Sequence, residues 1–317
     1  MSGHGAGPRV VPGAGSPGER VARALAPAKI NLVLDLLGPR PDGYTELATV
    51  FQEVALGDRV EVAVREGGTG RVDLLVTPVP PCPTGENLAF RAARRFLAAA
   101  GISVDVRITL EKEVPAGSGL GGGSSDGAAV LRCLAALFPG ALAPESLSRV
   151  AAGLGADVPF FLRGGLAAGR GRGDELRLLD DLPVFPVVLA RPRRSLATAD
   201  VYREARKGLT TRRDAPKMRA FLRHLERGGA GLPPVGNDLA PAATRLVPEI
   251  GELVAALREA GGRAAMTGSG TAVFGLFPRA EDAEAAARRL ARVPAAAWIR
   301  VTRTLPRERP PEDVREG

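Results

Sequence analysis

The sequence predicts an α+β protein built from two lobes. The chain has 317 residues, which is long enough for two lobes that each enclose a hydrophobic core. Helix-like and strand-like patterns follow one another without the strict alternation that a parallel α/β sheet requires. A second glycine-rich piece, residues 164–173, ends where we divide the chain. We expect lobes at 21–172 and 173–304, with structureless tails at 1–20 and 305–317.

The first predicted strand covers residues 22–36 and is mostly apolar. Lys29 and Asn31 interrupt it, and their spacing of two places both side chains on one face of the strand. Such a polar pair is either a satisfied buried pair or a ligand contact, and the spacing does not decide between them.

The rest of the first half alternates between strand and helix patterns. Asp42 and Gly43 predict a tight turn. Strands are expected at 49–51, 60–64, 72–76 and 104–110, and an amphipathic helix begins near residue 87. Asn87 suits the N-cap of that helix, which is the alternative to a ligand role for it.

A glycine loop with five glycines between residues 117 and 123 joins the strand at 104–110 to another apolar helix. Ser124 and Ser125 follow the loop, and either of them can cap that helix. A helix N-terminus fed by a glycine loop directs several N–H groups at one point, which suits a phosphate. No lysine follows Gly123 as a P-loop requires, and no strand ending in an acid follows the helix as a dinucleotide site requires.

The second half contains a helix at 144–154 and then Asp157, which stands between a small turn and an apolar run. An acid in that position is more often a helix cap or turn residue than a functional group. The second lobe is expected to contain a strand at 184–190, a basic helical region, a helix at 249–260, two strands around a glycine turn within 264–277, a helix at 281–292 and a last strand at 297–303.

Composition excludes several classes of protein. The net charge of +8 is spread without interleaved aromatic residues, so we expect solvated helix faces and no nucleic-acid partner. No run of eighteen apolar residues and no secretory signal is visible, so we expect no membrane partner. Cys82 and Cys133 are far apart and fit a reducing cytoplasm, and with only His4 and His224 a histidine triad or zinc site is not expected.

Lysine is scarce in this chain. Of 43 cationic residues only four are lysine: Lys29, Lys112, Lys207 and Lys217. Where arginine supplies nearly all the positive charge, a lysine inside a motif indicates a need for a compact point charge. Lys29 and Lys112 are the two lysines in motifs.

Five segments, taken in order, resemble the GHMP kinase superfamily. They are residues 27–32 (Pro-Ala-Lys-Ile-Asn-Leu), 40–44 (Arg-Pro-Asp-Gly-Tyr), 115–125 (Pro-Ala-Gly-Ser-Gly-Leu-Gly-Gly-Gly-Ser-Ser), 155–161 (Gly-Ala-Asp-Val-Pro-Phe-Phe) and 267–270 (Thr-Gly-Ser-Gly). Within that superfamily the chain is most similar, over residues 22–304, to the family that acts on a CDP-linked methylerythritol.

The resemblance implies a fold and a reaction. The N-terminal lobe would resemble the second domain of ribosomal protein S5, and the C-terminal lobe would be an α/β sandwich. The reaction would be ATP- and Mg²⁺-dependent phosphorylation of the 2-hydroxyl of CDP-methylerythritol in the non-mevalonate pathway of isoprenoid biosynthesis. The protein would be a cytoplasmic monomer or homodimer. Alternatives are another GHMP small-molecule kinase, of the homoserine or mevalonate type, and a basic binding protein without catalysis.

The resemblance also implies the site residues. Asp157 matches the catalytic base and Lys29 the lysine beside it. The segment expected to bind ATP comprises Asn87, Lys112, Pro115, Ala116, Gly117, Ser118, Gly119, Leu120, Gly121, Gly122, Gly123, Ser124 and Ser125. The residues expected to bind the alcohol substrate are Asn31, Tyr44, Thr45, Thr198, Tyr202, Gly268, Ser269 and Gly270, with the two tyrosines stacking on cytosine. The metal ligands are not assigned. One departure is Thr45, where the family usually has a histidine.

Overall fold

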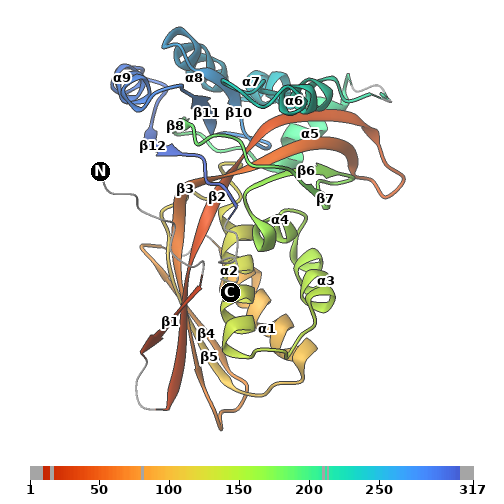
Figure 1. Ribbon diagram of the computed structural model, residues 1–317, viewed down its shortest axis with the longest axis vertical. Helices are drawn as coiled ribbons and strands as arrows, with labels where there is room; N and C mark the ends of the chain where they lie inside the picture. The colour runs from red at the N-terminus through yellow and green to blue at the C-terminus, as the bar shows by residue number, and fades with distance from the viewer. Residues whose placement is uncertain (1–9, 15–17, 80–81, 209–210, 213, 308–317) are drawn as a thin grey trace, which may run out of the picture.

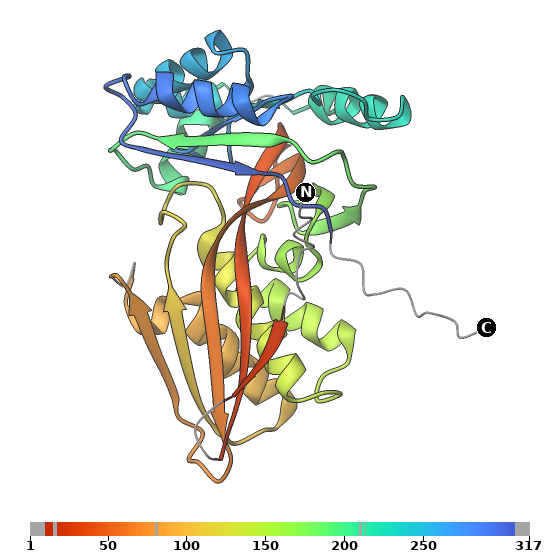
Figure 2. The same ribbon diagram turned by 60° about the vertical axis from the view of Figure 1, so that its left-hand side comes forward.

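The structure is a computed structural model that describes residues 10–14, 18–79, 82–208, 211–212 and 214–307. Two lobes lie one above the other in Figure 1, and the strands β2 (Glu19–Pro39) and β3 (Thr45–Arg65) connect them. These two strands of 21 residues each are antiparallel and run from the lower lobe to a position beneath the upper one (Figure 2). The expected α+β class in two lobes is confirmed.

The strand β3 is longer than the two short strands that the sequence predicts for it. Most of its side chains are buried, because sheets, helices and the second lobe cover both of its faces. A strand buried on both faces loses the alternation that identifies a strand in a sequence. The pairing is irregular between Pro27, which faces Gly57, and Ala28, which faces Val54. A Cβ on Gly57 would lie 2.7 Å from the carbonyl oxygen of Ala26.

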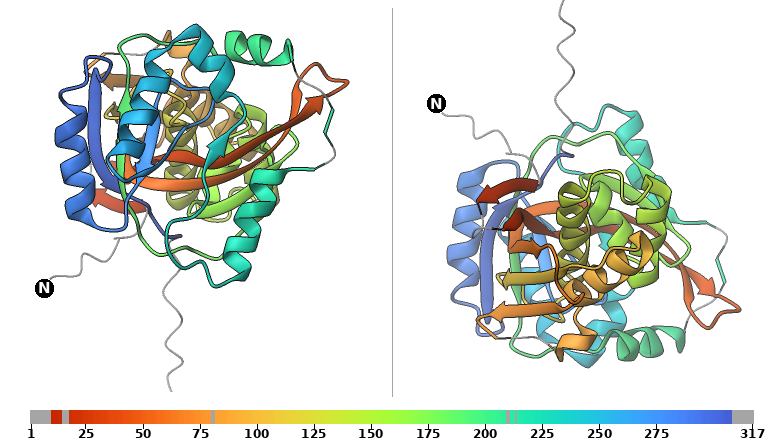
Figure 3. Two further views of the ribbon diagram at one scale, coloured as in Figure 1. Left: turned by 90° about the horizontal axis from the view of Figure 1, so that it is seen from above. Right: turned by 90° about the horizontal axis from the view of Figure 1, so that it is seen from below.

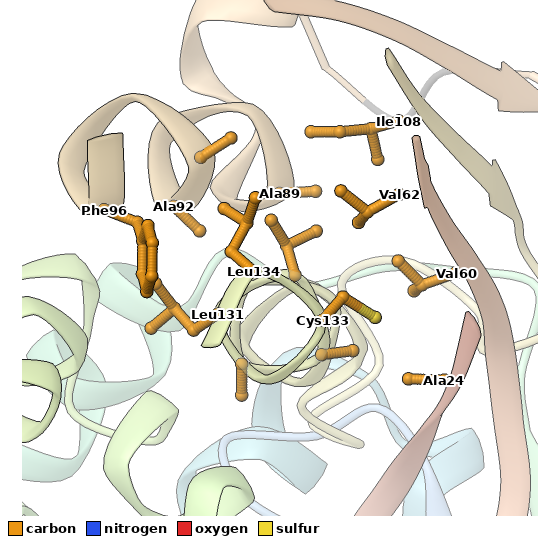
Figure 4. Packing of buried hydrophobic residues seen from close by; sticks show 14 of the residues in the cluster. Ala24, Val60, Val62, Ala89, Ala92, Phe96, Ile108, Leu131, Cys133 and Leu134 are labelled. Carbon is orange, nitrogen blue, oxygen red and sulfur yellow. The ribbon is translucent and has the colours of Figure 1, made fainter. Parts of the chain in front are cut away.

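The lower lobe is a sheet with helices on one face (Figure 1). Its strand order is β1-β2-β3-β5-β4, with β1 at Val10–Ala14, β5 at Asp105–Glu111 and β4 at Val72–Thr77. The covering helices are α1 (Leu88–Ala100), α2 (Gly122–Leu137), α3 (Pro144–Leu154) and α4 (Val158–Arg163). A 3-10 turn, η1 (Thr84–Glu86), precedes α1. Figure 4 shows α2 at the centre of this core, with Cys133 directed toward Val60 of β3 and Leu131 on the side of Phe96 of α1.

The upper lobe is a second antiparallel sheet of order β10-β11-β8-β12. Its strands are β10 (Arg263–Met266), β11 (Val273–Leu276), β8 (Pro186–Arg191) and β12 (Trp298–Arg303). Helices α7 (Ala240–Leu246), α8 (Glu249–Glu259) and α9 (Ala280–Leu290) lie over it, and the ends of β2 and β3 cross beneath them (Figure 3). Two further helices are α5 (Thr198–Arg206) and α6 (Pro216–Glu226).

The two lobes share a hydrophobic core. Ile30 and Val50, from the two long strands, belong to the same buried cluster as Leu189 of β8 and Phe274 of β11. The short strand β9 (Gly236–Asn237) also pairs in parallel with β2. Both lobes therefore pack on the same two long strands, and residues of these strands can contact residues of either lobe.

The boundaries of the lobes and tails differ from the prediction in places. The hairpin β6 (Leu166–Arg170) and β7 (Glu175–Leu178) lies across the predicted boundary at 172/173, with β6 paired to β3. Val10–Ala14 are not a structureless tail, because the early start of β2 offers them a strand to pair with. The backbone N–H of Leu305 donates to the carbonyl of Glu53, so the chain is still ordered at 305. Residues 1–9, 15–17 and 308–317 lie outside the described residues. Among the described helices, none is long and apolar enough to cross a bilayer.

Candidate active site

A cavity of about 1250 Å³ lies where the two lobes meet. Segments far apart in the sequence line it: the middle of β2, the glycine loop, the turn before α4, the start of α5 and the glycine turn after β10. Of the predicted site residues, the structure places these along the cavity: Lys29, Asn31, Tyr44, Thr45, Asn87, Lys112, Pro115, Ala116, Gly117, Ser118, Gly119, Gly121, Gly122, Gly123, Ser124, Asp157, Thr198, Tyr202, Gly268 and Ser269. Leu120, Ser125 and Gly270 are buried in the protein and do not line it.

The ammonium group of Lys29 lies beside the carboxylate of Asp157 at the centre of the cavity. The distance from Nζ to Oδ2 of Asp157 is 3.6 Å, and Nζ donates a hydrogen bond of 2.6 Å to Oδ1 of Asn31. Lys29 is 3 % exposed. This burial lowers the pKa of Lys29 from its ordinary value, while the charge of Asp157 acts in the opposite direction.

Asp157 is at the N-cap position of α4, but its side chain makes no capping hydrogen bond. The expectation of a cap is therefore wrong, while the expectation of a turn residue is confirmed, because Asp157 lies in the turn that precedes α4. Its carboxylate instead faces Lys29, and its side chain retains 30 % of its exposure. A carboxylate in this position is accessible to a ligand and has a cation within reach.

Asn31 links the two lobes through its side chain. Its Oδ1 accepts the bond from Lys29 and a second bond of 2.9 Å from the backbone N–H of Gly268. Its Nδ2 donates to Oγ1 of Thr49 at 2.7 Å, and its backbone N–H donates to Oγ1 of Thr267 at 3.0 Å. The polar pair in β2 is thus a satisfied buried pair that also borders the cavity.

The glycine loop turns into α2 through positive φ angles. Gly119 has φ 82° and Gly121 has φ 76°, and Gly121 is the N-cap of α2. The prediction that Ser124 or Ser125 caps this helix is wrong, because the left-handed backbone of Gly121 starts the helix before either serine. The free N–H groups of the first turn lie at the cavity, where the helix dipole favours an anion.

The glycine loop also packs against the glycine turn of the upper lobe. A Cβ on Gly119 would lie 2.5 Å from the carbonyl oxygen of Thr267. The backbone N–H of Ala272 donates to the carbonyl of Ser118 at 2.9 Å. These contacts require glycine for a close approach of two backbones, so the two glycine motifs form one wall of the cavity.

Lys112 borders the end of the cavity near Asn87 and is held by two acids. Its Nζ donates to Oδ2 of Asp126 at 2.6 Å and to Asp58. Burial raises the pKa of Asp126 to about 8, with the nearby charge of Asp58 adding to the effect and Lys112 opposing it. Neither acid could be anticipated from the sequence, because nothing local indicates that both contact the same lysine. Asn87 caps α1, with its Oδ1 accepting from the N–H of Ala89 at 2.9 Å, so the capping alternative is confirmed.

The opposite end of the cavity has the two tyrosines of the chain. Tyr44 is 55 % exposed, and the guanidinium of Arg172 lies 4.9 Å from its ring centroid. Burial raises the pKa of Tyr202 to about 12, and the charge of Asp157 contributes. Oγ1 of Thr198 and Oγ of Ser269 are 2.8 Å apart, so α5 is joined to the glycine turn. Arg172 was not anticipated from the sequence.

Two sequence models of protein families match the chain. The GHMP kinases N terminal domain matches residues 87–165, and the GHMP kinases C terminal domain matches residues 214–296. The first match contains the glycine loop and Asp157, and the second contains the glycine turn at 267–270.

Relatives that share one name match over most of the chain. The 4-diphosphocytidyl-2-C-methyl-D-erythritol kinase of Pelotomaculum thermopropionicum is 42% identical over 288 residues, which is 90% of this chain and 98% of the relative. That of Moorella thermoacetica is 46% identical over 268 residues, 83% of this chain and 92% of the relative.

Solved structures agree at the level of the fold. A crystal structure of 4-(cytidine 5'-diphospho)-2C-methyl-D-erythritol kinase is 40% identical with a TM-score of 0.74, covering 89% of this chain and 98% of its own. Homoserine kinase from Cytophaga hutchinsonii has a TM-score of 0.65 at 19% identity, covering 97% of this chain and 98% of its own. At that identity the likeness concerns the fold alone.

Proposed function

Because the chain belongs to the family of 4-diphosphocytidyl-2-C-methyl-D-erythritol kinases, we propose that it transfers the γ-phosphoryl group of ATP to the 2-hydroxyl of 4-(cytidine 5'-diphospho)-2-C-methyl-D-erythritol. The observation that carries this proposal is the pair of Lys29 and Asp157. It lies in one cavity with the glycine loop and with both tyrosines.

Asp157 serves as the general base in the proposed reaction. Its carboxylate takes the proton of the substrate hydroxyl while that oxygen bonds to the γ-phosphorus, and the bond from phosphorus to the β,γ-bridging oxygen breaks to release ADP. Because Asp157 makes no capping bond, its carboxylate is available for this role beside Lys29. Lys29, 3.6 Å away, stabilises the negative charge on the phosphoryl oxygens.

The glycine loop and the first turn of α2 are suited to the phosphates of ATP. Three glycines of the loop, Gly117, Gly119 and Gly121, have positive φ, and the N–H groups at the start of α2 border the cavity. Asn87 and Lys112 border the cavity further along and are assigned to the adenosine side. Tyr44 and Tyr202 are assigned to the cytosine ring, with Asn31, Thr45, Thr198, Gly268 and Ser269 as further substrate contacts.

Mg²⁺ belongs to the proposed reaction as the ion carried by ATP. Within the described ranges no three His, Cys, Asp or Glu side chains converge as a metal site. A cavity without such a cluster fits an Mg²⁺ ion that is held mainly by phosphate oxygens and water, with at most one or two protein ligands. The ion would neutralise charge on the phosphates, and its protein ligands stay unassigned.

The test is to incubate the purified protein with ATP, Mg²⁺ and one candidate alcohol at a time. We expect ADP formation with CDP-methylerythritol and none with homoserine or mevalonate. Turnover of homoserine or mevalonate alone would assign the chain to another GHMP kinase activity. Tight nucleotide binding without turnover of any of the three would indicate a binding protein and refute the proposal.

A further inference from the structure

Thr45, which stands where the family usually has a histidine, contacts the side chain of Arg206. Thr45 is 4 % exposed, and its Oγ1 accepts a hydrogen bond of 3.4 Å from Nε of Arg206. Nη2 of the same guanidinium donates to the carbonyl of Gly43 at 2.6 Å. One edge of the guanidinium thus holds the turn that carries Tyr44.

Arg206 also belongs to the helix that carries the second tyrosine. Tyr202 precedes it by four residues on α5, so the two side chains leave the same face of the helix. Both residues line the cavity, as do Tyr44 and Thr45. Arg206 therefore connects the two elements that carry the tyrosines and lies in the same cavity wall.

The other arginines at this end of the cavity are already paired with acids. Arg172 forms an ion pair of 3.0 Å with Asp174, and Arg203 forms one with Asp200 at 2.5 Å. Arg206 contacts no carboxylate within the ranges that the structure describes. Of its five N–H donors two are used by Gly43 and Thr45, so three remain for a ligand.

The three N–H donors that remain on Arg206 fit cytosine better than uracil. Cytosine presents two adjacent acceptors, O2 and N3, and a guanidinium can donate to both. Uracil has an N–H group at position 3 in place of an acceptor. This N–H would face an N–H of the guanidinium, so both of these donors would be left without an acceptor. Stacking on the tyrosines does not make this distinction, since every base has a π-face.

We infer that Arg206 is a specificity-determining residue that reads the O2 and N3 edge of cytosine and positions Thr45 and Tyr44 around the base. This inference rests on the proposed function for its substrate. Because the lone pair of Thr45 Oγ1 accepts from Arg206, the hydroxyl proton is left free to serve as another donor. An arginine and a threonine together thus supply a polar edge for the base.

The experiment compares Arg206→Ala and Arg206→Lys with wild type, using the cytidine and uridine forms of the substrate. In Arg206→Ala we expect the preference for cytidine in kcat/KM to fall by about tenfold to a hundredfold, which corresponds to hydrogen bonds of a charged donor. The loss of kcat/KM should appear as a higher KM for the cytidine substrate. We expect kcat to stay within about threefold of the wild-type value and the KM for ATP to be unchanged. Arg206→Lys keeps the charge without the two-pronged donor, so it should not restore the preference.

The matched control is Lys207→Ala. It removes a positive charge from the next residue of the same helix, where Lys207 pairs with Glu204 at 2.6 Å and does not line the cavity. The control should keep the wild-type preference. A thermal melt of each variant checks that α5 remains folded.

Binding of CDP and UDP, measured by calorimetry, decides the question independently of catalysis. We expect wild type to bind CDP more tightly than UDP and Arg206→Ala to bind them alike. Equal weakening of both nucleotides, or full restoration by Arg206→Lys, would mean that Arg206 acts only as a counter-ion of the diphosphate and would overturn the inference. If wild type fails to phosphorylate the cytidine substrate, the proposed function fails, and the CDP and UDP affinities still test Arg206.

Discussion

Replacing Lys29 with methionine tests the centre of the proposed mechanism. Methionine has nearly the length of lysine and keeps the apolar contacts of its stem, but it has no charge. When Asp157 takes the substrate proton it becomes neutral, and the Lys29 ammonium loses its counter-ion. The negative charge on the phosphoryl oxygens can then take that place, so the interaction is made most strongly in the transition state.

The geometry sets the size of the expected effect. Two unit charges 3.6 Å apart attract one another by about 4 to 5 kcal/mol at an effective dielectric constant of about 20. Asp157 is partly exposed, and Lys29 is already desolvated, so we take about half of that value. A loss of about 2 to 3 kcal/mol predicts a fall in kcat of roughly 30-fold to 150-fold.

The fold should survive Lys29→Met. The buried ammonium has a desolvation cost that methionine removes, and Asn31 keeps its bond from Gly268. We therefore expect a melting temperature equal to or above that of wild type. The assay is kcat at saturating ATP and CDP-methylerythritol, with thermal unfolding of the same sample. A kcat within threefold of wild type would refute the role of Lys29, and a large loss of Tm would refute the argument from desolvation.

Lys29→Arg separates charge from shape at the same position. A Cβ on Gly121 would lie 3.1 Å from Cγ of Lys29, and one on Gly268 would lie 3.3 Å from Nζ, so a broad guanidinium has little room. We expect a large loss of turnover in a folded protein. If arginine serves as well as lysine, charge alone is needed and the argument from the scarcity of lysine is wrong.

Three further predictions follow from the other parts of the cavity. Asp157→Asn should lower kcat by roughly a hundredfold or more with ATP affinity nearly unchanged, and turnover within a few-fold of wild type would reject Asp157 as the base. Thr45→Ala should cost about tenfold or less in kcat/KM, and Tyr44→Ala should cost more through lost stacking; the reverse order would contradict the assignment of the rings. The raised pKa of Asp126, about 8, means that the folded state holds its proton where the unfolded chain has released it. Unfolding free energy should therefore decrease as pH rises from about 4 to about 8, and Asp126→Asn should remove that part of the dependence; equal pH profiles of the two proteins would show the shift to be absent.

The parts of the site that depend on neighbouring residues can be predicted from the sequence. The glycine loop between a strand and a helix is readable because glycine spacing and apolar periodicity lie within a few turns of one another. The positions of Lys29 and Asn31 on one face of a strand follow from its period of two. The helix α2 starts before the serines that the sequence suggests as caps, because Gly121 adopts a left-handed backbone where Phe161 and Lys29 leave no room for a Cβ.

The contacts that join distant segments could not be read from the sequence. Lys112 meets Asp58 from β3 and Asp126 from α2 only after three elements have packed together. Arg206 reaches the turn at Gly43 across the mouth of the cavity. Neither pairing has a spacing or a period that a sequence pattern could reveal, so the identities of these partners required the fold.

Asn31 shows that a buried polar pair can be satisfied within the protein and still contribute to a ligand site. Its amide is used by Lys29, Thr49 and Gly268, which is what a satisfied structural residue requires. The bond to Lys29 occupies one of the three donors of the ammonium, and Asp157 lies near it at 3.6 Å. A donor therefore remains for a phosphoryl oxygen, in a direction that Asn31 helps to fix. The same contacts that satisfy the pair inside the protein orient the lysine toward the cavity, and they do so only while Gly268 of the upper lobe is in place.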